Sequence, residues 1–468
     1  MSATIVRPRP GAIPRDSAQA RERSVRRRVG IAWALLFFNT LTYVPGGLIN
    51  LPSHIGKVLP QGALPLALLL VISANPKLRL RPNVFLCLVS LLVIDTAFTV
   101  AGAPHFGEIY RTLRLDAYVA ALWLLTPWWG RSDMLILRWQ LRCLYVALGS
   151  VLLGLLVAPG KALHFDGRLS GVVWPMAATQ VAQYAAVTAG LTIVLWLARL
   201  LKGRPALAGV GFSLAILLLT HTRTALAALV AGMLVAGLSL FTINARVRKF
   251  FTVGVVAASI AVITVSGVII TWLARGQSTA GLTGLTGRTD FWQLVLELPR
   301  TRFQQIFGFG LSNASIKGLP IDSNWLSAYM QEGLFGVVVC AVILVWLYVA
   351  AFFQPRGVRR ALALFLVTYC TLSSFTEDSF TNVSTYLLHL TVAASLLVAP
   401  LARRRIFTPS RQPAPDRGTG GPPSGPAGRT AADAAVNVEL RLVQGWTRLS
   451  QKNRPEEPAS FLGIIVAH

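Results

Sequence analysis

The chain has 468 residues, of which 54% are hydrophobic and only 13% are charged, and its formal net charge is +26. A soluble globular domain carries about 25% charged residues, so this composition excludes an ordinary soluble protein and predicts a polytopic membrane protein. The basic residues stand in short runs between apolar stretches, which indicates membrane topology rather than nucleic-acid binding. We therefore expect membrane lipids, and no nucleic acid, among the partners.

Apolar runs of about 20 residues recur along the chain and predict an all-α fold of about twelve transmembrane helices. Every second connection is strongly basic, so the positive-inside rule places these connections and both termini in the cytoplasm, with the chain multi-pass in the cytoplasmic membrane. The basic connections lie at residues 21–28, 77–81, 131–142, 199–204, 244–249, 354–360 and 403–405.

Three regions follow from this pattern. Residues 1–28 are a basic cytoplasmic segment, residues 29–402 the transmembrane domain, and residues 403–468 a tail rich in Pro, Gly and Arg that we expect to be disordered and cytoplasmic. A short external connection is expected at residues 104–114. The longest external connection, residues 274–321 between the ninth and tenth helices, is polar and glycine-rich and is the candidate for the active site.

The cysteines lie in or beside apolar runs, which predicts free core residues rather than a disulfide framework or a metal site. They are Cys87, Cys143, Cys340 and Cys370.

The first candidate site residue is Arg223, in the sequence HTRTALAALVAG at residues 221–232. It stands at the predicted external end of a helix, beside Thr220 and Thr222. One interpretation is an arginine that only extends from the helix end toward the interface. The other is an anion site, because basic residues are disfavoured on the external side and a guanidinium binds phosphate through two parallel hydrogen bonds.

The second candidate is Arg288, in TGRTDFW at residues 286–292. Asp290 followed by Gln293 is typical of a helix N-cap with its capping partner, which places Arg288 just before the helix. An arginine beside the free amide groups of a helix N-terminus forms a phosphate site. The alternative is a loop arginine paired with Asp290. The helix that follows has an apolar stripe for packing on the membrane or on the spans, formed by Phe291, Leu294, Val295 and Leu298.

The third candidate is Asp322, in IDSNWLSAYMQEGLFG at residues 321–336. It opens the tenth predicted span, where an aspartate is among the best N-cap residues. It is also a carboxylate at the lipid boundary that can accept a proton from a sugar hydroxyl. Both interpretations stay open, and one residue can serve both.

These segments resemble the O-antigen ligase and polymerase superfamily over roughly residues 160–400. The ligase signature is a His followed by Asn, Ser or Gln, nine residues, a Gly, two residues, and a small residue or Tyr. Asp322, Ser323, Gly333 and Gly336 fit this spacing, with Asp322 in the position of the His.

The resemblance also extends to arginines. Arg223 and Arg288 match the external arginines that this family is thought to use to hold a lipid diphosphate. The sequence GRLSGVVWPMAATQVAQY at residues 167–184 resembles a further family segment and adds Arg168 as a candidate.

The resemblance implies a glycosyltransferase of cell-envelope polysaccharide biosynthesis. Its donor is a glycan on undecaprenyl diphosphate, and its acceptor is a second lipid-linked repeat, a lipid or cell-wall glycan, or a protein. An acceptor hydroxyl deprotonated by Asp322 attacks the anomeric carbon in a single displacement that inverts its configuration. The arginines stabilise the diphosphate leaving group, so neither a metal nor another cofactor is required.

Other polar residues are secondary candidates. Asp95 lies in the middle of a predicted span, where a charge is costly and indicates function or a protonated core carboxyl. The adjacent Glu377 and Asp378 lie in an external connection. His389 in the last predicted span is expected to be a core residue with its hydrogen bonds satisfied.

Two other classes of function compete with the enzyme. A transporter or flippase of lipid-linked glycans also suits about twelve spans, but transporters place their sites near the bilayer midplane and commonly contain repeats. No repeat is visible, and Asp95 is the clear charge in mid-membrane. A scaffold protein for envelope synthesis has no positive signal in the sequence.

Overall fold

The computed structural model describes residues 15–41, 43, 47–48, 52–102, 106–164, 167–254, 256, 264, 288–311, 315–316, 319–377 and 380–399. The chain divides into Met1–Pro400 and Leu401–His468. The second unit, which includes the predicted tail, lies outside the described residues, as do residues 274–287, 312–314 and 317–318 of the predicted connection 274–321.

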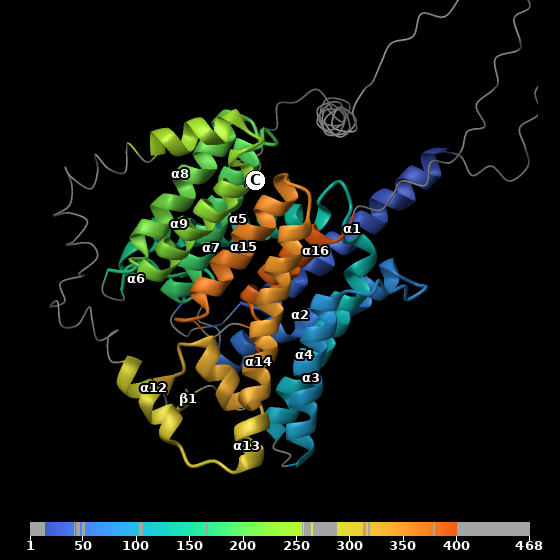
Figure 1. Ribbon diagram of the computed structural model, residues 1–468, viewed down its shortest axis with the longest axis vertical. Coiled ribbons are helices and arrows are strands. Elements are labelled where there is room, and N and C mark those ends of the chain that lie inside the picture. Colours follow the sequence, from blue (N-terminus) through green and yellow to red (C-terminus); the bar gives the residue numbers. More distant parts are fainter. Residues whose placement is uncertain are drawn as a thin grey trace, which may run out of the picture. The chain divides into compact units, whose positions relative to one another are not determined.

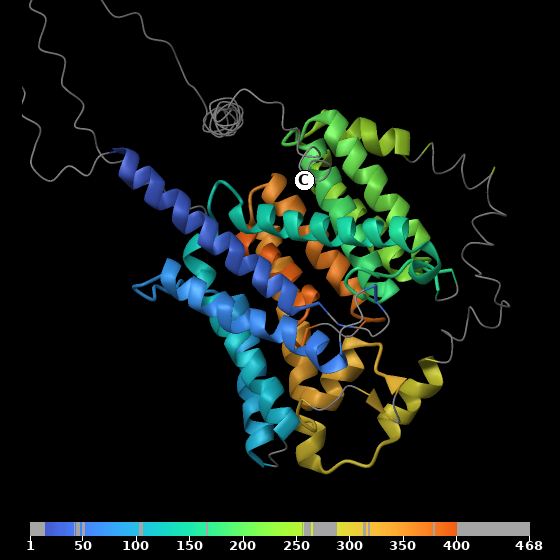
Figure 2. The same ribbon diagram turned by 180° about the vertical axis from the view of Figure 1, so that it is seen from behind.

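The described residues are mostly helical (Figures 1 and 2). The first half contains α1 (Arg15–Asn39), α2 (Ser53–Ala74), α3 (Val84–Gly102), α4 (Phe106–Leu125), the 3-10 turn η1 (Thr126–Trp128), α5 (Leu135–Val157), α6 (Pro159–Ala162), α7 (Ala178–Leu197), α8 (Gly203–Leu219) and α9 (Arg223–Phe241). The second half contains α12 (Arg288–Glu297), α13 (Arg302–Phe307), α14 (Asn324–Phe353), α15 (Val358–Ser373) and α16 (Thr385–Leu397). Strands β1 (Ser315–Ile316) and β2 (Leu319–Pro320) pair antiparallel.

Five of the described helices are long and apolar enough to cross a membrane, namely α3, α5, α7, α9 and α14. Shorter apolar helices occur at Val58–Ala74, Gly203–Leu219 and Thr385–Leu397. A helical membrane protein is thus supported among the described residues, while the number twelve stays a prediction.

Helix α7 lies at the centre of the helical packing. It contacts α5, α8, α9 and α15, and 83% of its span is buried inside the protein, against 39% for α9 and α14. Helix α7 also has the lowest mean hydropathy of the five candidate spans and α14 the highest. The two facts agree, because a helix enclosed by other helices can carry Thr and Gln side chains that find protein partners, whereas a helix that faces lipid cannot.

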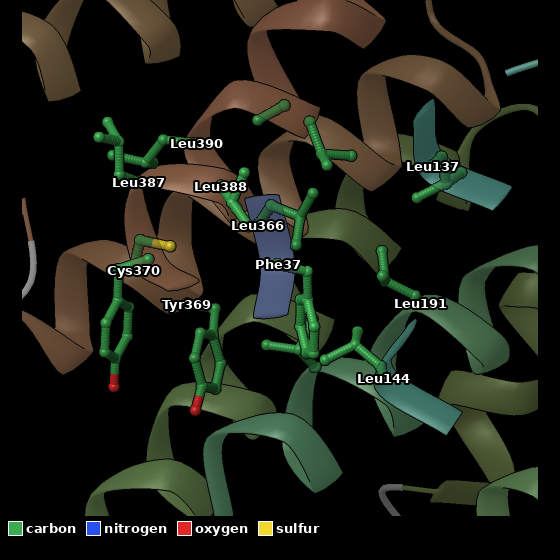
Figure 3. Packing of buried hydrophobic residues seen from close by; sticks show 14 of the residues in the cluster. Phe37, Leu137, Leu144, Leu191, Leu366, Tyr369, Cys370, Leu387, Leu388 and Leu390 are labelled. Carbon is green, nitrogen blue, oxygen red and sulfur yellow. The ribbon is translucent and has the colours of Figure 1, made fainter. Parts of the chain in front are cut away.

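The apolar core joins segments that are far apart in the sequence. Figure 3 shows Phe37 of α1 and Leu191 of α7 in one cluster with leucines of α5, α15 and α16. All of these labelled side chains are buried. Helix α15 of this core packs against α9 and α16.

The predicted connection at residues 104–114 is wrong for most of its length, because α4 already begins at Phe106. Arg114, one of the charged residues in this stretch, has its partner in a neighbouring helix. Arg114 donates from Nη2 to the carbonyl oxygen of Asn39, at the end of α1, over 2.6 Å. Asn39 Nδ2 in turn donates to the carbonyl of Pro60 in α2 over 2.7 Å. An arginine that satisfies the last carbonyl of another helix is compatible with a buried helical position.

Candidate functional site

Arg223 lies at the tight turn between α8 and α9, where it is the first residue of α9. His221 turns the chain with a φ of 50°, in the left-handed region, and Thr222 occupies the N-cap position without a side-chain cap bond. Two guanidinium nitrogens of Arg223, Nε and Nη2, are buried and have no hydrogen-bond partner among the described residues. A buried donor without an acceptor is costly, so this position is suited to an anionic ligand.

Arg168 is held against the same turn. Its Nε donates to the carbonyl oxygen of Thr220 over 3.0 Å, and its Nη2 donates to Thr222 Oγ1 over 3.2 Å. The neighbouring amide of Leu169 donates to the carbonyl of Leu219 over 2.9 Å. The structure therefore brings the predicted residues Arg168 and Arg223 to one turn. Arg168 stabilises the C-terminal end of α8 through the carbonyl of Thr220. Its second partner, Thr222, is the residue before Arg223.

Arg288 is the first residue of α12, not a residue before it. The N-cap predicted at Asp290 is wrong, since Asp290 lies inside the first turn. Gln293 Nε2 donates forward to Glu297 Oε1 over 2.8 Å instead of capping the N-terminus. An aspartate at any position of the first turn interacts favourably with the helix dipole. The presence of Asp290 therefore does not show at which residue the helix begins. The side chains of residues 288–291 lie outside the described part of the structure.

Asp322 lies half-buried in the extended segment between Ile321 and the start of α14. The N-cap position of α14 belongs to Ser323, which makes no side-chain cap bond. The interpretation of Asp322 as the N-cap is therefore wrong by one residue. Asp322 precedes the N-cap residue of the helix.

The start of α14 is tied to the segment after α15. The amide of Asn324 donates to the carbonyl of Ser374 over 2.9 Å, and Asn324 Oδ1 accepts from the amide of Phe380 over 2.6 Å. Asn382 Nδ2 donates to Gln331 Oε1 over 3.2 Å. These bonds connect the segment that carries Asp322 with the one that carries Glu377.

Glu377 is half-buried in that second segment, and its amide donates to the carbonyl of Ser373 over 3.0 Å. Asp378 lies outside the described residues. Of the predicted acidic pair, Glu377 thus belongs to the segment linked with Asp322.

Helix α14 is broken at Gly333, the glycine of the ligase-like spacing, which has a φ of 66° and a ψ of −159°. A Cβ at Gly333 would collide with the carbonyl of Ile306. Glycine is therefore required both by the positive φ and by the lack of space for a side chain. The break allows the chain after α13 to enter. The amides of Phe309 and Gly310 donate to the carbonyls of Met330 and Gln331, each over 2.9 Å.

Arg300 is a residue that sequence reasoning missed. Its Nη2 donates to the carbonyl of Val295 over 2.9 Å, and its Nη1 to that of Tyr329 over 3.3 Å. Its guanidinium lies 4.1 Å from the ring centre of Tyr329 and 5.5 Å from that of Phe309. Burial lowers the pKa of Arg300 from its usual range. Arg300 thus fastens α12 and the residue 309 segment to the first turns of α14.

Asp95 is buried in α3, and its Oδ2 has no hydrogen-bond partner among the described residues. It lies one helical turn before Thr99, whose Oγ1 would be 3.5 Å from a Cβ at Gly310. Asp95 therefore lies on α3 near the chain that enters the break in α14, while no described contact joins it to Arg223 or Arg168.

His389 is buried in α16, as expected, but its bonds are not all satisfied. Nδ1 is 3.4 Å from Gln183 Nε2 of α7, and Nε2 has no partner among the described residues. The four cysteines are free thiols, as predicted. Cys87 is exposed on α3 rather than in the core, and the other three are buried.

No protein-family model matches this sequence, and no curated protein is similar enough to be matched to it. The resemblance to the O-antigen ligase and polymerase superfamily therefore stays a prediction based on the motifs.

Proposed function

We propose that the protein is a glycan transferase of the O-antigen ligase and polymerase type in the cytoplasmic membrane. It moves a glycan from a polyprenyl diphosphate to an acceptor hydroxyl on the external side. In this proposal the chain crosses the membrane about twelve times with both termini in the cytoplasm, and residues 274–321 are external.

The observation that carries the proposal is the guanidinium of Arg223, whose Nε and Nη2 are buried and have no partner among the described residues. It lies at the N-terminus of α9, where the helix dipole also favours negative charge. Arg168 adds a second positive charge at the same turn. A diphosphate at the end of an isoprenoid chain fits this position, since its charged head needs cations at a membrane surface while its tail stays in lipid.

The catalytic step follows from these roles. Asp322 accepts the proton of the acceptor hydroxyl, whose oxygen forms the new bond to the anomeric carbon as the bond from that carbon to the diphosphate breaks. Arg223 and Arg288 bind the polyprenyl diphosphate that leaves, with Arg168 bracing the turn. Acceptor oxygen and leaving group lie on opposite sides of the sugar, so the configuration inverts.

A transporter of lipid-linked glycans is the second candidate, favoured by the buried carboxyl of Asp95 within α3. The two functions differ in their products. A transferase makes a new glycosidic bond in detergent solution, whereas a transporter moves its substrate only between two sides of a sealed membrane.

The test is transfer from a purified polyprenyl-diphosphate-linked glycan to an acceptor glycan by the purified protein, with products separated on gels. Arg223→Ala is expected to reduce transfer about 100-fold, the scale of removing one positioned charge donor. Arg223→Lys should recover only part of the activity, because lysine cannot make two parallel bonds. Arg204→Ala, at the other end of α8 and exposed, is the matched control and should transfer normally.

Asp322→Asn is expected to abolish transfer while the protein folds, since Ser323 rather than Asp322 holds the N-cap position. Asp322→His should retain partial activity with a pH profile displaced upward, because imidazole titrates nearer neutrality than a carboxyl group. Wild-type transfer by both Arg223→Ala and Asp322→Asn would contradict the proposal.

A further inference from the structure

Helix α13 has an exposed apolar side. It follows the capping box formed by Thr301 and Gln304, and 46% of Phe303 and 48% of Ile306 are exposed. Helical geometry places Phe303, Ile306 and Phe307 on one side and Gln305 on the other. Two large apolar side chains half-exposed on one side of so short a helix form an apolar patch that suits an apolar surrounding.

The same side of α13 contacts two candidate membrane spans. The ring centre of Phe98 in α3 is 5.9 Å from that of Phe303 and 5.7 Å from that of Phe307. The ring of Phe307 is also 6.2 Å from that of Phe335 in α14. This aromatic cluster joins α13 to α3 and α14, and its exposed edge is continuous with their apolar surfaces, where Phe98 and Leu334 are each 57% exposed.

The position of the break in α14 sets the depth of this cluster. Residues 334–353 alone extend about 30 Å at 1.5 Å per residue, which is the thickness of the hydrocarbon layer. The residues before Gly333 are more polar, with Gln331 and Glu332 buried within the protein. Phe335 is the second residue of the apolar part, and Phe98 lies in the last turn of the α3 span, which ends at Ala101. Both residues therefore mark one boundary of the membrane.

The backbone near the break is adapted to such a boundary. The carbonyls of Met330 and Gln331 lose their helical partners at Gly333 and accept from Phe309 and Gly310 instead. Gly308 shares the glycine-only conformation, with a φ of 77° and a ψ of −167°. Irregular backbone is tolerated next to lipid only where protein satisfies its polar groups in this way.

We propose that residues 300–311 are an interfacial membrane anchor, in which Phe303 and Ile306 insert between the acyl chains of the bilayer that α3 and α14 cross. The occupant of this apolar surface is lipid, because the surface continues the lipid-facing sides of two spans. The segment therefore lies at the lipid boundary instead of standing wholly in water. This inference is independent of the proposed function.

The test uses spin labels on single cysteines in a background in which the four native cysteines are replaced by alanine or serine. The protein is placed in bilayers of phosphatidylethanolamine and phosphatidylglycerol. Collisions of the label with oxygen, which concentrates in lipid, are compared with collisions with a water-soluble nickel chelate. Labels at Ile306→Cys and Phe303→Cys should favour oxygen, and a label at Gln305→Cys should favour the nickel chelate.

Two reference positions calibrate the measurement. Val146 on α5 is 73% exposed within a candidate span and supplies the lipid value, and the exposed Arg23 on α1 supplies the aqueous value. Ile306 contributes no ring to the aromatic cluster, so its variant keeps the test valid if Phe303→Cys fails to fold. An aqueous value at residue 306 equal to that at residue 305 would overturn the proposal.

Discussion

The turn between α8 and α9 and the start of α14 both place polar side chains at the end of an apolar helix, but they satisfy them differently. At the start of α14, Asn324 and Gln331 exchange hydrogen bonds with the segment after α15. At the other turn, two nitrogens of Arg223 lack a partner among the described residues. The hydrogen bonds of Asn324 and Gln331 join two segments of the scaffold, whereas the two buried nitrogens of Arg223 that lack an acceptor among the described residues are suited to an anionic ligand. The two regions thus separate the scaffold from the candidate binding site.

The largest effect is expected from Gly333→Ala, which changes the glycine at the break in α14 and so disturbs the scaffold region. The glycine-only conformation costs another residue about 1–3 kcal/mol, and the Cβ also collides with the backbone at Ile306. We expect loss of most folded protein, measured as the monodisperse fraction after purification. Gly211→Ala in α8, where a Cβ meets nothing within 4 Å, should give a normal yield. Equal yields would show that the break is not required.

Arg223→Met tests the turn between α8 and α9. Unlike Gly333→Ala, it should not destabilise the folded protein. Without ligand, removing a guanidinium with two buried nitrogens that lack acceptors among the described residues should leave the free energy of unfolding unchanged or raise it by up to about 1–3 kcal/mol, and the melting temperature should follow. Polyprenyl diphosphate should stabilise the wild type and not the variant. A lower melting temperature of the free variant would mean that Arg223 already has a structural partner.

Asn324→Ala should destabilise the protein by about 1–3 kcal/mol, because it leaves the buried amide of Phe380 without its acceptor. Thermal unfolding in detergent measures this change. Transfer by the protein that remains folded should persist, in contrast to Arg223→Ala. Thr252→Ala, an exposed residue with a local bond to its own helix, is the neutral comparison, and an equally small change at Asn324 would contradict the expectation.

The smallest effect concerns arginines that do have acid partners. Glu22 contacts Arg26 and Arg131 at 2.8 and 2.9 Å, and hydrogen bonds from these arginines lower the pKa of Glu22 from its usual value of 4.5. A lowered folded pKa means that the stabilisation is present above pH 4.5 and is lost as the pH falls through the folded pKa. The melting temperatures of wild type and Glu22→Gln should therefore differ slightly at pH 7 and converge at lower pH. A constant difference would exclude titration of Glu22 as the cause.

The positions of several apolar helices could be predicted from the sequence, because a membrane span is recognised by its local amino-acid composition. The start of α9 at Arg223 and the apolar character of α3 and α14 followed from hydropathy and from the glycine and threonine residues at the ends of helices. The glycine at position 333 was recognised by spacing, although its physical reason, a backbone collision with Ile306, needs the structure.

What escaped prediction depends on partners distant in the sequence. The sequence around Arg114 predicts a loop, whereas the acceptor of Arg114 is the carbonyl of Asn39, 75 residues earlier in the chain. Arg300 carries no motif, and its contacts with Tyr329 are visible only in three dimensions. The misplaced cap at Asp290 has a different origin, because acidic residues favour every position of a first helical turn.

The enclosure of α7 has a consequence for the biosynthesis of the protein. This helix has the lowest mean hydropathy of the candidate spans and is the most enclosed by protein. Lipid alone holds such a helix weakly, since insertion into a bilayer is favoured by apolar and opposed by polar side chains. Its stable residence in the membrane thus depends on neighbours such as α8 and α15, which are synthesised after it. Truncation of the growing chain between α9 and α15 would then release α7 from the bilayer more readily than α5 or α9.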